Sequence, residues 1–179
     1  MEWTWILLII VVLLIAAGVA LYNNLVQNRQ KVKEAFSTID VYLKKRYDLI
    51  PNLVETVKGY AGHEKETLEN VTQARNMAMA ASNPETEFAA NNMLSSTLKS
   101  LFAVTESYPD LKANTNFLDL QGQLARIEEE IALSRKYYNG TVRDYNTMIE
   151  QVPSNIIAGM TGFKGEPFFE TEPESKVAP

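Results

Sequence analysis

The residue types that could do chemistry are few and scattered in this chain. Its 179 residues include one histidine, His63, and no cysteine. Thiolate catalysis, disulfides, cysteine-ligated metals and sites with two imidazoles are therefore excluded. Serines and aspartates occur, but a catalytic triad needs its base within hydrogen-bond reach of the nucleophile, and no motif predicts that arrangement. We therefore expect no catalytic residue, no cofactor and no enzyme activity.

An acidic run, Glu128-Glu129-Glu130, is the densest group of potential metal ligands. Successive residues of an α-helix point about 100° apart, so three in a row cannot converge on one ion. The run is typical of a solvated helix face, and no metal site is predicted.

Composition narrows the class of protein. Apolar residues make up 46% of the chain and charged residues 22%, which is enough for one domain with a core and one additional segment. The net charge of -5 argues against nucleic-acid binding, because phosphate backbones are bound by basic surfaces.

The additional segment is an uncharged stretch at residues 3–22. As a helix its twenty residues would extend about 30 Å, the thickness of a bilayer's hydrocarbon core. Trp3, Trp5 and Tyr22 stand where interfacial aromatic residues are common. A cleaved signal peptide is the alternative, but Glu2 replaces the usual positive charge and the apolar run is too long. We expect a transmembrane helix that contacts the lipid bilayer through residues 3–22.

The distribution of basic residues predicts the orientation of this helix. No Lys or Arg precedes it, whereas Arg29, Lys31, Lys33 and the run Lys44-Lys45-Arg46 follow it. Positive residues favour the cytoplasmic side. We expect a single-pass protein of the bacterial cytoplasmic membrane, with residues 1–2 outside and residues 23–179 cytoplasmic.

Heptad spacing predicts an all-α domain at residues 23–152. Apolar positions recur at sevens in two phases near its start and again near its end, as in coiled coils. We predict helices at about 25–60, 64–81, 84–107 and 115–151, with a kink rather than a stop before Pro51. Two long and two shorter helices favour an antiparallel four-helix bundle. The repeating positions are Val32, Ile39, Arg46 and Leu53, then Phe36, Leu43, Ile50 and Val57, and finally Phe117, Leu124, Ile131, Tyr138, Tyr145 and Val152.

Arg46 is a charged residue at a position of the repeat that otherwise holds aliphatic residues. If the first and last helices are antiparallel neighbours and Val57 lies level with Phe117, paired positions sum to about 174, which places residue 128 beside Arg46. An unpaired buried guanidinium is costly. We expect Arg46 to pair with Glu128 or Glu130. Alternatively, its aliphatic chain extends along the core so that the guanidinium reaches water.

Residues 153–169 are apolar without a helical period, and residues 170–179 are acidic and expected to be disordered. The apolar segment could pack on the bundle, on the membrane or in a partner's groove. The candidate partner contacts are the large aromatic residues of this segment, Phe163, Phe168 and Phe169. Tyr137 and Arg143 are further candidates, because they lie outside the heptad positions of the last helix.

Several longer motifs resemble the LemA family. They include Arg46-Tyr47-Asp48-Leu49-Ile50-Pro51-Asn52-Leu53-Val54, Gly59-Tyr60, Phe117-Leu118-Asp119-Leu120-Gln121, Arg135-Lys136-Tyr137-Tyr138-Asn139 and Pro153-Ser154-Asn155. The resemblance covers nearly the whole chain except the acidic end after Glu170. It implies an N-terminally anchored bacterial membrane protein with an α-helical bundle and no established biochemical activity.

Two functions are compatible with these features. The first is a membrane-tethered scaffold or assembly factor, which binds a membrane protein or a second copy of itself. The second is a membrane-shaping or lipid-binding protein in which the long first helix and residues 156–169 both act on the bilayer. Only Lys164 in that segment could meet anionic lipid, which disfavours the second.

Overall fold

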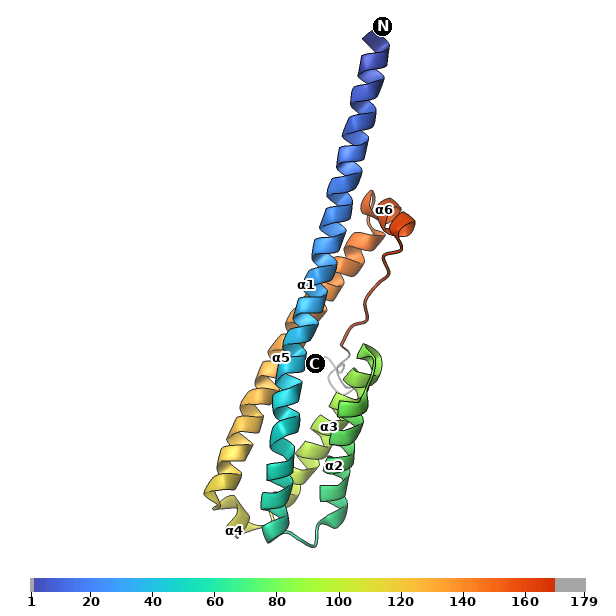
Figure 1. Ribbon diagram of the computed structural model, residues 1–179. Coiled ribbons are helices and arrows are strands. Elements are labelled where there is room, and N and C mark those ends of the chain that lie inside the picture. The colour runs from blue at the N-terminus through green and yellow to red at the C-terminus, as the bar shows by residue number, and fades with distance from the viewer. Residues whose placement is uncertain (1, 170–179) are drawn as a thin grey trace, which may run out of the picture. The chain divides into compact units, whose positions relative to one another are not determined.

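The computed structural model describes residues 2–169, and every regular element in that range is a helix. The order along the chain is α1 (Glu2–Tyr60), α2 (Lys65–Ala80), α3 (Pro84–Thr105), α4 (Pro109–Lys112), α5 (Thr115–Glu150) and α6 (Ser154–Thr161), as Figure 1 shows. The predicted all-α class is confirmed. The expected disordered tail at 170–179 lies outside the described residues, as does Met1.

The chain divides into two compact units, and α1 and α5 each contribute to both. Unit 1 comprises Met1–Ser37 and Lys136–Phe168, and unit 2 comprises Thr38–Arg135 and Phe169–Pro179. Each unit has a buried core of its own.

The core of unit 2 follows the heptad spacing of α1 and α5, because those positions return to one helix face. Arg46 is buried among them and is fully inaccessible to solvent. The apolar core residues include Ile39, Leu43, Ile50, Leu53 and Val57 of α1, Leu68, Val71, Ala74 and Ala78 of α2, Phe88, Leu94, Leu98 and Leu101 of α3, and Leu111, Phe117, Leu124 and Ile131.

Local signals explain where the shorter helices begin. Asn83 caps α3, since its Oδ1 accepts a hydrogen bond of 2.9 Å from the backbone N of Thr86, and Pro84 occupies the first turn. The single turn of α4 after Tyr108 was not expected from the sequence. It also begins at a proline, Pro109.

Pro51 lies inside α1 and the helix continues through it. A proline has no backbone N–H, so the carbonyl of residue 47, four residues earlier, loses its usual donor. Nε of Arg75 on α2 donates to that carbonyl at 2.8 Å. Ala74, the residue before it, is buried on α2, and the Arg75 side chain replaces the donor that Pro51 lacks.

In unit 1, α1 from about residue 28 onward lies antiparallel to the last part of α5. The rings of Phe36 and Tyr138 are 5.8 Å apart, and Nδ2 of Asn28 lies 3.6 Å from the sulfur of Met148. Residue numbers rise along one helix as they fall along the other. Val152, the last position of the predicted repeat, is 79% exposed, because α5 ends at Glu150.

The segment after Pro153 contradicts our expectation of an apolar stretch without helical period, because residues 154–161 form α6. Its sequence is too short for periodicity to reveal a helix. The helix ends at Gly162, whose φ of 75° is left-handed and favours glycine. The backbone N of Phe163 then donates to the carbonyl of Ala158 at 3.1 Å.

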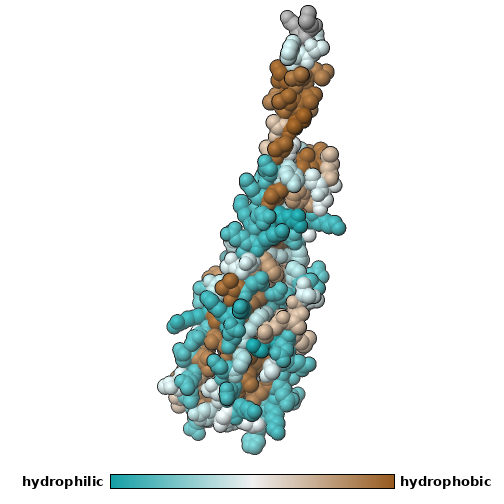
Figure 2. Space-filling view, viewed as in Figure 1, coloured by the Kyte–Doolittle hydropathy of each residue, from teal (hydrophilic) through white to brown (hydrophobic). Residues whose placement is uncertain are grey.

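The N-terminal part of α1 is apolar and exposed along its length. Large side chains from Trp3 to Val19 are between 44% and 83% accessible, and apolar surface gathers over this part of the helix in Figure 2. Within the described residues this is the one helix long and apolar enough to cross a membrane. Water-facing surfaces rarely carry so large an apolar patch.

Candidate functional site

The most concentrated polar group in unit 2 is centred on Arg46. Its Nη1 donates to Oε1 of Glu128 at 2.7 Å and to Oγ of Ser95 at 2.8 Å, and its Nη2 donates to Oδ1 of Asn91. The same Asn91 oxygen accepts a hydrogen bond of 2.7 Å from the hydroxyl of Tyr47. Side chains from α1, α3 and α5 thus meet at one guanidinium. We call these five residues the Arg46 cluster.

The Arg46 cluster is asymmetric in its contact with solvent. Arg46 and Asn91 are completely buried, whereas the side chain of Glu128 is 37% exposed. Among the described residues, Nε of Arg46 has no hydrogen-bond partner. Burial also raises the pKa of Tyr47 above 10, so its hydroxyl stays protonated and can donate to Asn91. The cluster is therefore a buried cation whose charge is balanced at the protein surface.

The structure brings Arg46 and Glu128 together but not Arg46 and Glu130. The carboxylate of Glu130 interacts instead with the hydroxyl of Tyr42 and raises the pKa of that hydroxyl. A second contact gives the same antiparallel register: Nδ2 of Asn114 donates to the hydroxyl of Tyr60 at 2.9 Å. Both pairs, 46 with 128 and 60 with 114, sum to 174.

A pair of carboxyl groups lies between α1 and α3, the two helices that also carry Arg46 and Asn91. Glu87 is one helical turn before Asn91 on α3 and shares a hydrogen bond with Asp40 of α1. Burial, the charge of Asp40 and this hydrogen bond raise the pKa of Glu87 to about 7. Burial also raises the pKa of Asp40. The two carboxyls therefore share a proton near neutral pH.

These groups are placed to join helices rather than to meet a substrate. The Arg46 guanidinium is enclosed by its own partners, and two surface hollows of unit 2, of about 840 and 510 Å³, are lined by other residues. Among residues 2–169, no cluster of three or more His, Asp and Glu side chains could hold a metal ion. Chemically, the Arg46 cluster can fix the register of α1 against α3 and α5.

In unit 1, side chains of α5 hold the extended segment that follows α6, a role that our sequence analysis missed. The hydroxyls of Tyr138 and Tyr145 donate to the carbonyls of Pro167 and Lys164 at 2.8 and 2.9 Å. Asn146 binds the backbone of residue 166 twice, donating to its O and accepting from its N, both at 2.9 Å. The available signal was the repeated Tyr-Asn pair seven residues apart on the buried face.

We call Tyr138, Tyr145 and Asn146 the tyrosine clasp. Burial and the nearby Glu166 raise the pKa of Tyr138 to about 12, and burial also raises that of Tyr145. Both hydroxyls therefore remain neutral donors at physiological pH. The Oδ1 of Asn146 approaches residue 165 so closely that a Cβ there would lie 3.3 Å from it, which explains the glycine at that position.

The five candidate partner contacts differ in exposure and packing in the structure. Tyr137 and Arg143 are exposed on α5, and Phe168 is about half exposed. Phe163 packs its ring against Tyr22, with centroids 5.8 Å apart. Phe169 is buried in unit 2, stacked on Phe88 at 3.8 Å. The expectation that Phe169 contacts a partner is therefore wrong, because the protein's own core covers it.

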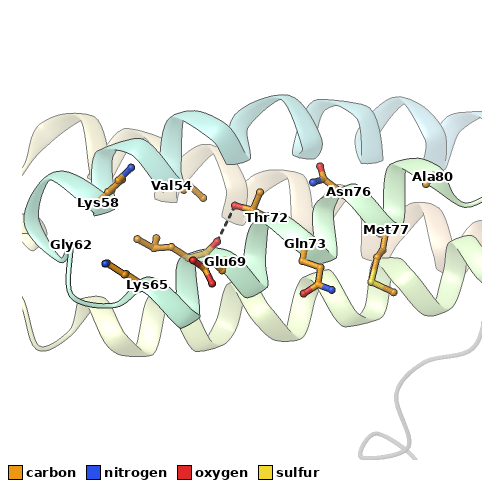
Figure 3. A pocket seen from close by; sticks show the side chains of 11 residues that line it. Val54, Lys58, Gly62, Lys65, Glu69, Thr72, Gln73, Asn76, Met77 and Ala80 are labelled. Carbon is orange, nitrogen blue, oxygen red and sulfur yellow. Dashed lines mark hydrogen bonds between the residues drawn. The ribbon is translucent and has the colours of Figure 1, made fainter.

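A groove of about 840 Å³ runs between the end of α1 and α2 in unit 2. Figure 3 shows Val54 and Lys58 on the α1 side, opposite Thr72 and Met77 on α2. Met77 is about half exposed. The groove is not visible in the sequence, because its lining combines residues of two helices. The lining residues are Val54, Lys58, Gly62, Lys65, Leu68, Glu69, Thr72, Gln73, Asn76, Met77 and Ala80.

The chain is similar in sequence to named bacterial proteins. The chain is 27% identical over 140 residues to protein LemA of Metamycoplasma hominis, covering 76% of this chain and 63% of that protein. It is 24% identical over 189 residues to magnetosome protein MamQ 2 of Paramagnetospirillum magneticum, covering 91% of this chain and 70% of the relative. The matched region thus spans about two thirds of these relatives.

The profile of the LemA family matches residues 35–179. This match includes the Arg46 cluster, the tyrosine clasp and the groove, and it begins after the exposed apolar part of α1. It also reaches the acidic end, which our sequence analysis had placed outside the resemblance. Because the match covers most of its length, the chain belongs to the LemA family.

Proposed function

We propose that this protein is a non-enzymatic scaffold or assembly factor, anchored in the bacterial cytoplasmic membrane by residues 3–22 with the rest of the chain in the cytoplasm. In this proposal α1, α2, α3 and α5 form an antiparallel four-helix bundle in unit 2. The Arg46 cluster holds that bundle in one register. The partner is another membrane protein or a second copy of the chain.

The groove between α1 and α2 is the observation that carries the binding role. Its walls combine aliphatic and methionine side chains with the charged side chains of Lys58, Lys65 and Glu69. Such a groove suits an amphipathic helix, whose apolar side chains would contact the apolar walls while its polar side chains meet the charged residues. Exposed methionine adapts readily to the shape of a bound side chain. Tethering to a membrane raises the effective concentration toward partners in that membrane.

Site-specific photocrosslinking in native membranes tests this role. A photoreactive residue at Met77, inside the groove, should form a discrete adduct with its partner. The matched control is Leu133, which is also exposed and apolar in unit 2 but lies outside the groove. An adduct of twice the chain's mass would identify self-association, and mass spectrometry would identify any other partner.

A blocking substitution makes the result specific to the groove. Thr72→Trp would fill the groove from α2 and should abolish the adduct formed at position 77. Equal labelling from positions 77 and 133, or an adduct insensitive to Thr72→Trp, would refute the groove as the binding surface.

The proposed orientation in the membrane has its own test. A reporter fused to the C-terminus should be active in the cytoplasm, and access of periplasmic protease to unit 2 would refute the cytoplasmic orientation.

A further inference from the structure

The short helix α6 combines two features that the proposed scaffold role does not explain. Its eight residues carry no charge, and the large apolar side chains on its outer side are exposed. Ile156 is 59% accessible and Met160 is 80% accessible, and Val152 just before the helix is 79% accessible. These three positions are four residues apart, so Ile156 and Met160 share one helix face.

The opposite face of α6 packs within unit 1. Ser154 and Ala158 are buried, and Oγ of Ser154 donates to the carbonyl of Met148 at 2.6 Å. Small buried residues let α6 lie close to its neighbours. The helix is therefore held in place with Ile156 and Met160 directed outward.

The position of α6 along α1 identifies what could cover that outward face. A methyl group added at Gly18 would lie 3.9 Å from Cδ1 of Ile157, which is ordinary van der Waals contact. Gly18 belongs to the exposed apolar part of α1, four residues or about 6 Å before Tyr22. Just after α6, Phe163 packs on Tyr22 itself. In Figures 1 and 2, α6 lies beside α1 where its apolar surface ends.

We propose that α6 is an interfacial membrane helix, whose exposed face of Ile156 and Met160, with Val152 just before the helix, inserts among lipid acyl chains at the boundary with the headgroups. This inference rests on the proposed membrane anchor: if residues 3–22 cross the bilayer, Ile157 lies at the depth of the last turn of that span. An apolar helix lying in the interface is stabilised by burial of its apolar face. Because α6 has no charged residue, its insertion does not depend on anionic headgroups.

Spin labels on single cysteines can measure the surroundings of α6 in the full-length protein. The chain has no cysteine of its own, so Met160→Cys carries the only label. Lipid-soluble oxygen and a water-soluble nickel chelate then report lipid and water separately in phosphatidylcholine nanodiscs. Leu13→Cys, within the apolar stretch, is the lipid control.

Tyr137→Cys is the matched water control, because Tyr137 is an exposed side chain of unit 1. Its neighbour Tyr138 packs on Phe36, which is eighteen residues or about 27 Å beyond Gly18 along α1. We expect the label at position 160 to be at least about threefold less accessible to the nickel chelate than the label at 137, as for a side chain in the interface. Oxygen should reach the label at position 160 more readily than the label at position 137.

Each contrary result has a distinct meaning. Nickel accessibility at 160 equal to that at 137 would place α6 in water and overturn the inference, while a lipid signal at 13 would leave the anchor intact. If neither reagent reached position 160, protein would cover α6 and the inference would again fail. A water signal at position 13 would overturn the anchor itself and with it the inference. Because these nanodiscs contain no anionic lipid, insertion at position 160 that is seen only after anionic lipid is added would contradict the acyl-chain contact. Ile156→Cys provides an independent second reading.

Discussion

The two units use polar side chains in opposite ways. In unit 2 a buried guanidinium joins three helices through the partners of Arg46, and one of those partners carries the balancing charge. In unit 1 the tyrosine clasp holds an extended segment with neutral hydroxyl and amide groups that bind backbone atoms. A neutral donor that loses its acceptor can turn to water, whereas a buried cation cannot. Damage to the Arg46 cluster should therefore cost much more than damage to the clasp.

Asn91→Ala should have the largest effect. Oδ1 of Asn91 accepts from both Arg46 and Tyr47, and all of these groups are buried. Removing it takes this acceptor from two donors, and Nη2 of Arg46 keeps only its 3.5 Å contact with the backbone carbonyl of residue 91. We therefore expect a loss of about 3 kcal/mol in the free energy of unfolding. Chemical denaturation of the full chain in detergent, followed by helical circular dichroism, measures it. Ser96→Ala, at an exposed position of α3, should change stability by less than about 0.5 kcal/mol.

Glu128→Gln should come next, at about 2 kcal/mol, below the usual cost of breaking a fully buried pair because Glu128 is 37% exposed. Glu129→Gln, on the same helix and exposed, is the control. The double variant Arg46→Leu with Glu128→Gln should be more stable than Glu128→Gln alone, since it removes the stranded charge. Additive losses in this double-mutant cycle would show that the two residues are not coupled.

Glu87→Gln tests the shared proton through its pH dependence. The pKa of Glu87 is raised from 4.5 to about 7, so the folded protein keeps a proton that the unfolded chain releases between these values. The stability from this proton is fully present below pH 4.5 and is lost as the pH rises to about 7. Glutamine stays neutral, so the variant should lose less stability than the wild type between pH 5 and pH 8.

The partial exposure of Glu87 should keep this pH effect below the loss in Glu128→Gln. Glu85→Gln, at an exposed position in the same turn of α3, is the control and should retain the wild-type slope. Parallel pH profiles for the wild type and Glu87→Gln would disprove the shared proton.

Tyr145→Phe tests the clasp of unit 1. The ring remains, and only the hydrogen bond to the carbonyl of Lys164 is lost, at a cost of about 1 kcal/mol. We expect faster hydrogen exchange at the backbone N of Glu166, which Asn146 holds, with little change at amides in the middle of α3. Tyr137→Phe should leave the exchange unchanged. A loss as large as that of Asn91→Ala would remove the contrast between the units.

Pro51→Ala should have the smallest effect, below about 1 kcal/mol in either direction. The new N–H of residue 51 can bind the carbonyl of Tyr47, but it then competes with Nε of Arg75. Arg75→Ala should destabilise the proline-containing protein more than the alanine variant, because only the former has no other donor for that carbonyl. Equal losses in both backgrounds would show that Arg75 does not compensate for Pro51.

Residue spacing by itself determined the helical class and the positions that are buried in the long helices. Ile39, Leu43, Phe117 and Leu124 are core residues because a seven-residue repeat returns them to one face. The α3 start at Asn83 and Pro84 was equally visible, since capping depends on neighbouring residues only. The same register arithmetic placed Arg46 level with residue 128.

Tertiary structure decided which polar groups find buried partners on other helices and where the apolar C-terminal segment lies. Asn91, Ser95 and Glu87 are ordinary polar residues of α3 in the sequence, and only the approach of α1 gives them the Arg46 guanidinium or Asp40 as partners. Phe163 and Phe169 look alike in one short segment, yet one packs on Tyr22 and the other on Phe88. Helical periodicity reports which face of one helix is buried, but partners distant in sequence depend on how the chain closes its loops and packs.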